Sequence, residues 1–479
     1  MNNAIEFFSE VENKLPVENI KYDDICAWQF LRQSYREKYT NTSISSSNIN
    51  KNKFKIFKNI YLIISIFKKS FRGFFNYYKQ KKYILFTSQI NEKVIEGKIS
   101  DKFSHHLIKY LKDELLIFQI PSSGSKIKKK SDYYYSACVS SWTMYLRCLP
   151  EIVYNLLPFS KFKLQGQNIL NEIEKKLNIK VNYKFKTVLF FAFYRRFLKY
   201  FKKNKNLKCI FIECYMGIIH QSAIYAAKKC GIISIELQHG IISKAHLGYI
   251  VPQKIGRDSF PDYLFTFGDY VKDVLKNSFI NNKNIIPTGS YYLEYLGNNK
   301  NIFNNSYDYC NSLHKSYQKL VAVTGQVTID RQLLEIIRVA ALTLPEIVFL
   351  YIPRKYNEHY KALKLPQNMI ICENFGFYEL IQFCDLHATV YSTCALESVF
   401  FGIPNILYNL NNLSRYYYQE ILDNENYTRY CDDMQSFIDT VNNWNLPSKE
   451  EVKSYSVKFY EPESEKKLVN SLKTILNHT

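Results

Sequence analysis

The sequence predicts an α/β protein made of two Rossmann-like, doubly wound lobes that face each other across a cleft. The chain has 479 residues, a length that suits two domains better than a single core. Apolar residues make up 47% and charged residues 22%, as in ordinary globular proteins. From residue 82 onward, short apolar runs alternate with helical stretches, a pattern typical of parallel sheets joined by right-handed crossovers.

Each half of the chain contains its own set of expected strands. In the first half, strands are expected at 83–87, 115–120, 209–213 and 232–237. Helices are expected between some of them, at 104–116 and 167–177. In the second half, strands are expected at 319–323, 347–352, 368–372, 388–391 and 405–408. Helices are expected between these strands at 330–342, 378–384 and 395–401. Each half therefore builds a parallel sheet of its own.

The stretch 297–318 separates the two halves, because it is rich in Asn, Ser and Tyr and shows little periodicity. We expect an N-lobe at 82–296 and a C-lobe at 319–445, with 297–318 as the linker. A basic, amphipathic segment precedes the lobes at 1–81, and a helical tail follows them at 446–479.

Positive charge dominates the sequence, with 64 Lys and Arg against 43 Asp and Glu and a net charge of +21. This balance favours anionic partners such as nucleic acid, phospholipid head groups or nucleotide-linked substrates. Residues 51–82 contain ten Lys or Arg and no acid, interleaved with aromatic and aliphatic residues. Such a helix either lies in the surface of an anionic membrane or packs its apolar face on the protein. No nucleic-acid recognition motif accompanies the charge.

The cysteines and the first residues of the chain indicate the cellular compartment of the protein. Eleven cysteines are scattered without a C-x-x-C pair, and the start of the chain lacks the features of a secretion signal. We expect reduced thiols and a cytoplasmic protein, bound peripherally at the inner face of the membrane. The apolar run at 60–67 is far shorter than the ~20 residues that a spanning helix needs.

Polar residues that follow strands are the best site candidates, because ligands of open parallel sheets bind outside the carboxyl ends of the strands. The expected strand at 209–213 ends in Glu213. This carboxylate is either a general base or a helix-entry residue favoured by the helix dipole. The patterns G-x-G-x-x-G and G-x-x-x-x-G-K-[ST] are absent from the sequence, so dinucleotide and NTPase functions lose their main support.

The second candidate loop begins with Gln238, His239 and Gly240 directly after the strand at 232–237. An imidazole with a pKa near 6.5 can take a proton from a hydroxyl acceptor, which makes His239 a candidate general base. The alternative is a structural histidine that only donates and accepts hydrogen bonds. Lys244 and His246 follow on the same loop, so we group them with Gln238 as candidates for the acceptor side.

The third candidate loop carries Ser392 and Thr393 at an expected strand-to-helix turn, with Glu397 one helical turn later. Free backbone N–H groups and hydroxyls at such a turn suit a phosphate, and Glu397 suits a ribose hydroxyl. The alternative is an ordinary helix cap with a glutamate that completes it.

Two neighbouring strand ends add further candidates for anion binding. Thr324 and Gln326 follow the first expected strand of the C-lobe, and Arg354 and Lys355 follow the second. Arg354 offers a bidentate fork for phosphate, and Lys355 a point charge. The alternative is that both cations are solvated surface residues without a ligand.

The order of these candidate loops along the chain resembles that of the bacterial GT-B glycosyltransferases that assemble capsule or lipopolysaccharide. The likeness covers roughly 209–441 and is greatest for capsule and polysialyltransferase-type enzymes. The His-Gly turn at 239–240 is similar to that of the glycerophosphotransferases of teichoic-acid synthesis. The segments 262–270 and 286–290 look like the part that closes the N-lobe in this group.

The resemblance implies a nucleotide-activated sugar held by the C-lobe and a glycan or lipid-linked acceptor held by the N-lobe. Ser392, Thr393 and Glu397 match the donor-binding turn of the group, and His239 matches the base of the glycerophosphotransferases. A His-Pro pair of the sialyltransferase-like members is replaced here by Ile-Pro at 352–353. That difference argues against a sialyltransferase.

For the donor phosphate, the replacement of the His-Pro pair leaves Arg354 or Lys355. GT-B enzymes need no bound metal, and Asp-x-Asp is absent here, so neither a metal nor a cofactor is expected. Transfer of a polyol phosphate from a CDP-linked donor is the alternative reaction. Nucleic-acid binding is less favoured than either.

Overall fold

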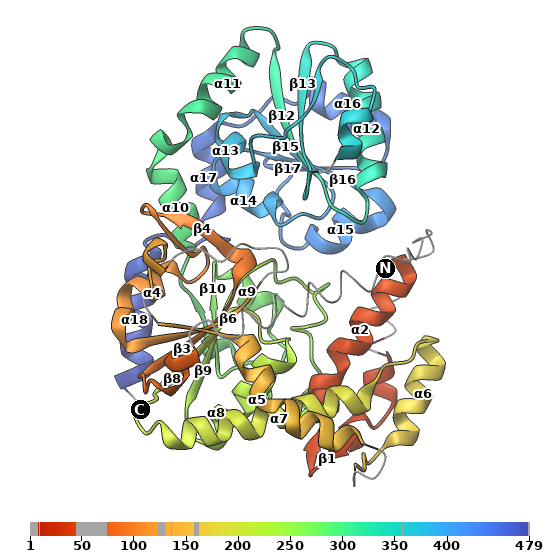
Figure 1. The fold of residues 1–479 in the computed structure, drawn as a ribbon. Helices are drawn as coiled ribbons and strands as arrows, with labels where there is room; N and C mark the ends of the chain where they lie inside the picture. The colour runs from red at the N-terminus through yellow and green to blue at the C-terminus, as the bar shows by residue number, and fades with distance from the viewer. Residues whose placement is uncertain are drawn as a thin grey trace.

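The computed structural model describes residues 8, 10–44, 74–121, 130–135, 137–157, 162–356 and 358–477. Two parallel sheets, each flanked by helices, form two lobes, as the sequence predicts (Figure 1). Most of the basic stretch expected at 51–82 lies outside the described residues. Within the described part, no helix is both long enough and apolar enough to span a membrane.

The N-lobe sheet has seven strands in the order β11-β10-β9-β8-β3-β6-β7, and every neighbouring pair is parallel. Its strands are β3 (Tyr83–Ser88), β6 (Leu115–Ile120), β7 (Cys138–Ser140), β8 (Cys209–Ile212), β9 (Ile233–Leu237), β10 (Tyr263–Thr266) and β11 (Ile285–Pro287). In the central strands, apolar side chains are buried on both faces, and Leu85 of β3 stands opposite Ile117 and Phe211. Continuous apolar runs of this kind are typical of parallel strands covered by helices.

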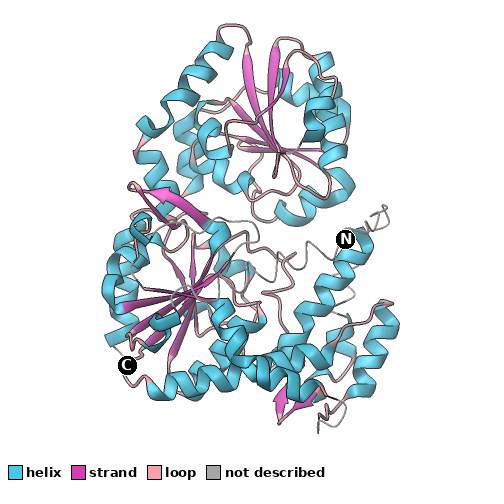
Figure 2. Cartoon of the chain, viewed as in Figure 1, coloured by secondary structure: helices cyan, strands magenta, loops and turns pink. Residues whose placement is uncertain are grey.

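The C-lobe sheet has six parallel strands in the order β14-β13-β12-β15-β16-β17. They are β12 (Lys319–Thr324), β13 (Ile347–Ile352), β14 (Met369–Ile371), β15 (Leu386–Thr389), β16 (Asn405–Tyr408) and β17 (Thr428–Cys431). All nine strands expected from the sequence are present. β15 begins two residues ahead of the predicted start at 388. Both sheets and their helical layers are visible in Figure 2.

The helices of the N-lobe cover both faces of its sheet. They are α4 (His105–Leu111), α5 (Ser141–Leu156), α6 (Gln167–Leu177), α7 (Tyr183–Lys203), α8 (Ile218–Lys229), α9 (Tyr270–Val274) and α10 (Tyr291–Asn298). The helix expected at 104–116 ends early, because Lys112 has a φ of 42° and β6 begins at Leu115. A hairpin of β4 (Glu92–Ile95) and β5 (Lys98–Asp101) follows β3 and extends toward the C-lobe (Figure 1).

Residues near the N-terminus form a layer on the N-lobe. α2 (Trp28–Ile44) follows a short ribbon of β1 (Lys21–Tyr22) and β2 (Ile25–Cys26). Phe30 of α2 stacks on Phe190 of α7, with ring centroids 4.0 Å apart. Arg32 forms a buried ion pair with Glu12 at 2.7 Å and donates to the carbonyl of Leu247. The N-terminal helix therefore braces the loop that follows β9.

The helices of the C-lobe flank its sheet in the same manner. They are α11 (Asn304–His314), α12 (Asp330–Thr343), α13 (Phe377–Leu380), α14 (Cys394–Phe400), α15 (Leu413–Tyr418) and α16 (Met434–Asn443). The stretch 297–318 between the sheets is largely helical, since it contains the end of α10 and the whole of α11.

The C-terminal segment returns to the N-lobe. α17 (Lys449–Ser456) packs on α14, whereas α18 (Ser464–Asn477) packs on α4 and α10. Leu468 and Leu472 belong to the same apolar cluster as the strands β3 and β8. Glu294 of α10 accepts hydrogen bonds from the backbone N–H and the hydroxyl of Ser464. The C-terminal segment therefore contacts both lobes, the C-lobe through α17 and the N-lobe through α18.

Candidate functional site

The loops that follow the carboxyl ends of the strands in the two lobes are in contact, and they carry most of the predicted site residues. Lys102, which follows the N-lobe hairpin, donates a hydrogen bond to the hydroxyl of Tyr378 in α13 over 3.2 Å. Lys244, on the loop after β9, forms an ion pair with Glu420 of the C-lobe at 2.7 Å. The carboxyl-end loops of the two lobes therefore meet.

Glu213 lies at the end of β8 in a buried cluster with Thr87 and Asp101. The Thr87 hydroxyl oxygen is 2.7 Å from Asp101 Oδ2 and 2.7 Å from Glu213 Oε1. A hydroxyl has one proton to donate, so one of the two carboxyl groups must itself be protonated. Burial, followed by the charge of Asp101, raises the pKa of Glu213 well above its usual value. Asn91 also donates to Glu213 over 2.8 Å, so this carboxyl is held by the protein.

Glu236, in the middle of the same edge, is a second buried carboxyl group. Its Oε1 accepts hydrogen bonds from the Tyr249 hydroxyl at 2.9 Å and the Tyr215 N–H at 3.1 Å. Its Oε2 has no hydrogen-bond partner among the described residues. Burial raises the pKa of Glu236 to about 8, so the group is mostly protonated at neutral pH.

His239 follows β9 and is half-buried at this edge. Its Nδ1 is buried without a hydrogen-bond partner in the described part of the chain. Burial lowers the pKa of His239, while the nearby Glu236 acts in the opposite direction. The Phe103 ring stands edge-on to the imidazole, with centroids 6.4 Å apart. The imidazole is therefore neutral at pH 7 and has a nitrogen able to accept a proton.

The other candidates on this loop differ in their contacts. Gln238 is buried, donates to the Gly240 carbonyl at 2.8 Å and accepts from the Phe267 N–H at 2.7 Å, so its amide holds the loop in place. Lys244 is exposed and pairs with the C-lobe as described above. Burial lowers the pKa of His246 to about 3, and its ring lies 4.9 Å from that of Tyr249.

On the C-lobe side, Ser392 and Thr393 form the turn between β15 and α14, where the sequence placed them. The hydroxyl of Ser392 accepts from the N–H of Cys394 at 3.3 Å, and both hydroxyl-bearing residues are half-buried. Glu397, one turn into α14, accepts a hydrogen bond from the Tyr378 hydroxyl over 2.8 Å. The turn and the carboxylate therefore face the same region as α13.

Tyr378 and Lys102 are functional candidates that sequence reasoning missed. Together with Glu397 they form a continuous chain of hydrogen bonds that crosses from the N-lobe hairpin into the C-lobe. Lys102 also lies 4.5 Å from the ring of Phe103, the residue beside His239. Local sequence carries no signal for this contact, because Lys102 and Tyr378 are 276 positions apart.

The remaining C-lobe candidates divide into buried and exposed residues. Thr324 is buried and its hydroxyl is 2.9 Å from His387 Nε2, a contact inside the lobe. Gln326 accepts from the N–H of Tyr391 at 3.0 Å and so fixes the start of the 392–393 turn. Arg354 and Lys355 follow β13 as predicted, and both are exposed.

The cations of both lobes lie near the start of α14. Burial raises the pKa of the Cys394 thiol to about 12, and the charges of Lys102 and Arg354 both oppose this rise. Repulsion from Lys102 and Arg354 likewise adds to the effect of burial in lowering the pKa of Lys93 on the hairpin. Among the described residues, no group of three or more His, Cys, Asp or Glu could hold a metal ion.

Comparison with known proteins found no matching family model and no matching curated protein. Among solved structures, a putative UDP-N-acetylglucosamine 2-epimerase from Listeria monocytogenes is 11% identical, with a TM-score of 0.50 over 84% of this chain and 98% of that chain. MnaA of S. aureus, solved with UDP, is 11% identical, with a TM-score of 0.50 over 83% and 98%. The wall teichoic acid polymerase TagF, soaked with CDPG, is 13% identical, with a TM-score of 0.45 over 87% of this chain and 98% of that chain.

At these identities the likeness concerns the fold and not the reaction. The two matches with a TM-score of 0.50 span nearly the whole length of those proteins and both sheets of this chain. The chain therefore has the two-lobed GT-B fold.

Proposed function

We propose that the protein is a glycosyltransferase that moves a sugar from a nucleotide-activated donor to a growing surface glycan, such as a capsule, O-antigen or lipooligosaccharide. One observation carries this proposal: the hydrogen-bonded chain from Lys102 through Tyr378 to Glu397. It joins the turn proposed to hold the donor to the edge that carries a neutral imidazole. An acceptor hydroxyl and a donor would thus meet between the lobes.

In this proposal the C-lobe binds the nucleotide without a metal ion. The hydroxyls of Ser392 and Thr393 bind phosphate, and Glu397 binds a ribose hydroxyl. Arg354 and Lys355 offset the charge that develops on the leaving nucleotide phosphate. The likeness in fold to MnaA, whose structure contains UDP, supports a nucleotide as a ligand of this protein.

On the N-lobe, His239 takes the proton of the acceptor hydroxyl as it attacks the sugar. Two observations favour His239 over Glu213 as this base. Its pKa is lowered, so it is unprotonated at neutral pH, and its Nδ1 has no protein partner among the described residues. Glu213 has a raised pKa and shares its proton with Asp101 and Thr87. His246 and Lys244 are proposed to line the acceptor side.

Peripheral binding to the inner face of the cytoplasmic membrane is a separate part of the proposal. It rests on the basic stretch 51–82 and on α5, where Leu149, Val153 and Tyr154 are 50%, 50% and 61% exposed. Apolar side chains beside basic residues suit the surface of an anionic bilayer. Sedimentation with vesicles that contain anionic lipid, but not with zwitterionic vesicles, is expected. Equal binding to RNA at physiological salt would contradict it.

The donor is identified by two measurements on the full-length chain. Thermal stability is first recorded with UDP, GDP, CMP and CDP, because a ligand that binds only the folded state raises the melting temperature. The matching nucleotide sugar is then incubated with an acceptor glycan, and the product is analysed by mass spectrometry. A mass increase of one sugar supports the proposal. A product that retains phosphate in the new linkage would instead identify a phosphotransferase that uses a CDP-polyol.

A further inference from the structure

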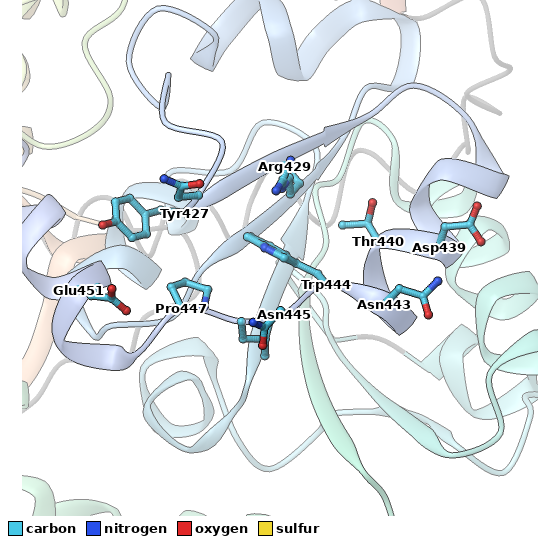
Figure 3. Close-up of a pocket in the computed structure, with 11 residues that line it drawn as sticks. Tyr427, Arg429, Asp439, Thr440, Asn443, Trp444, Asn445, Pro447 and Glu451 are labelled. Carbon is cyan, nitrogen blue, oxygen red and sulfur yellow. The ribbon is translucent and has the colours of Figure 1, made fainter.

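A hollow with a volume of about 720 Å³ lies on the C-lobe between the start of β17 and the end of α16 (Figure 3). This volume is within the range of small-molecule binding sites. Tyr427 precedes β17, and Trp444 follows α16. Because β17 is parallel to β16, the residues before it lie at the amino ends of the C-lobe strands. The candidate donor site follows the carboxyl ends, at the opposite edge of the sheet.

Unpaired amides surround an aromatic ring in this hollow. Trp444 is half-buried against the C-lobe core, and its indole N–H has no hydrogen bond to any described residue. The side-chain amides of Asn426 and Asn445 are exposed and also lack hydrogen bonds among the described residues. Each amide offers donors and an acceptor, the groups that pair with neighbouring hydroxyls of a sugar. The ring supplies a flat apolar face on which sugar C–H groups can pack.

The cation of the hollow is already engaged. Arg429 is the one Lys or Arg among the described residues that line it. Its guanidinium lies 5.6 Å from the Trp444 ring and 3.7 Å from a carboxylate oxygen of Glu425. Figure 3 shows Arg429 directly beside Trp444. Trp444 and Glu425 therefore compete with a phosphate group for the guanidinium of Arg429.

Carboxylates outnumber cations along the walls, although the whole chain has a net charge of +21. Asp439 and Glu451 line the hollow. A second hollow of about 390 Å³ shares Asn426 and is lined by Asp423 and Glu425 as well. Walls of this sign repel nucleotides, anionic lipids and anionic polymers. The two adjoining hollows suit an uncharged, extended ligand.

We propose that these hollows form a binding site for an uncharged glycan chain, separate from the site of transfer. The choice of a glycan that is also the acceptor or product rests on the proposed function. In that role the site holds a distant part of the growing chain while its end is extended between the lobes. Losing the site should therefore shorten the products without preventing a single transfer.

The test uses the full-length chain and a panel of neutral oligosaccharides built from hexoses and N-acetylhexosamines, with binding followed by titration. Trp444→Ala and Asn445→Ala are each expected to weaken binding about tenfold or more, since the first removes the apolar face and the second removes an amide that makes no hydrogen bond within the described protein. Asn445 makes no side-chain hydrogen bond within the described protein, so its variant tests the site even where Trp444→Ala is unstable. Tyr307→Ala, at an exposed tyrosine on α11, is the matched control and should bind normally.

Three results would overturn the proposal: no neutral oligosaccharide binds, binding survives both variants, or an anionic polysaccharide binds these hollows more tightly than a neutral one. The affinity for the nucleotide is measured in parallel on the same proteins. Both variants should keep this affinity unchanged. Loss of nucleotide binding in the unmodified chain would count against the proposed function and not against the glycan site.

Discussion

The carboxyl-end edges of the two lobes have the same fold but contrasting chemistry. On the N-lobe, Glu213 and Glu236 are buried, and burial raises their pKa values while it lowers that of His239. On the C-lobe, Ser392 and Thr393 supply uncharged hydroxyls, and the two cations after β13 are exposed. We call the N-lobe edge the dry edge, because its titratable groups are buried. We call the C-lobe edge the wet edge, because its cations are exposed to solvent.

The difference shows how one architecture supports two tasks. A dry edge holds titratable groups in their neutral forms, which suits the transfer of a proton at pH 7. The wet edge leaves Arg354 and Lys355 accessible to a ligand, which suits the binding of phosphate. Tyr378 joins the two edges, because its hydroxyl contacts Lys102 on one side and Glu397 on the other.

Removal of the imidazole on the dry edge should have the largest effect. His239→Ala is expected to lower kcat for sugar transfer about 100- to 10,000-fold, the usual contribution of a general base. Nucleotide affinity should not change, because the nucleotide is assigned to the wet edge. His314→Ala, on α11, is the control and should retain full activity. An active His239→Ala enzyme would end the assignment of the N-lobe edge to proton transfer.

The contrast in burial also predicts that acid will unfold the N-lobe first. Burial lowers the pKa of five N-lobe histidines: His105, His106, His220, His239 and His246. In the C-lobe it lowers the pKa of His387, to about 4. As the pH is lowered, each such histidine is protonated in the unfolded chain before it is protonated in the folded one. The free energy of unfolding therefore decreases as the pH falls from about 6.5 to the folded pKa. The loss is about 1.4 kcal/mol per histidine and pH unit.

Three N-lobe glutamates act in the opposite direction. The pKa values of Glu213, Glu236 and Glu294 are raised, for Glu236 to about 8, so these groups bind protons in the folded state first and stabilise it as the pH falls toward 4.5. Four of the histidines have folded pKa values of about 3 to 4 and outnumber the three glutamates, so the N-lobe loses stability as the pH falls from about 6 toward 4.5. Hydrogen exchange at pH 5 should therefore show faster opening of the N-lobe strands than of the C-lobe strands.

His106→Leu checks this argument directly. Both ring nitrogens of His106 are buried without partners among the described residues, so the substitution breaks no hydrogen bond. The variant should lose about 1.4 kcal/mol less stability than the unmodified chain for each pH unit below about 6. The same change at His314, a partly exposed histidine on α11, is the control for replacing a histidine. Equal acid sensitivity of His106→Leu and the unmodified chain would contradict the role of this histidine in acid unfolding.

The wet edge is tested through Glu397. Glu397→Ala should weaken nucleotide affinity about 10- to 150-fold, because a hydrogen bond to a charged group contributes about 1.5 to 3 kcal/mol. Titration of the nucleotide measures this effect, with Glu450→Ala on α17 as a control for loss of a C-lobe carboxylate. Unchanged nucleotide affinity would remove Glu397 from the donor site. It would also contradict the assignment of nucleotide binding to the C-lobe edge.

Much of the fold could be predicted because a buried parallel strand is recognised from a short run of its own apolar residues. The run Cys-Ile-Phe-Ile that forms β8 needs only its own apolar residues to be recognised. β7, β10, β11 and β17 were not predicted. None of them is a purely apolar run like β8, since each contains Ser, Thr, Pro or Arg. β17 reads Thr-Arg-Tyr-Cys, and its two central residues are only half-buried. Strands of this kind form because a neighbour is already in place.

The candidate site was predictable only in part, for the same reason. The loops with His239 and Ser392 directly follow strands, a relation that sequence shows. Lys102 and Tyr378 meet only after both lobes have folded, and Asp101 reaches Glu213 only through the β4–β5 hairpin. Whether a polar side chain faces a ligand is also decided by packing. Gln238, Thr324 and Gln326 instead make hydrogen bonds within the protein.

The smallest expected effect separates the two candidate bases. In Glu213→Gln a neutral amide replaces a carboxyl group that is already protonated, and the amide can still bond Thr87 and Asn91. Activity at pH 7 should therefore fall less than about tenfold, whereas loss of a true base costs about 100-fold or more. Glu213→Ala is the companion variant. It leaves buried donors unsatisfied, so the free energy of unfolding should fall by about 1 to 3 kcal/mol. If Glu213→Gln were as inactive as His239→Ala, Glu213 would be an ionised base, contrary to the raised pKa that burial gives this carboxyl group.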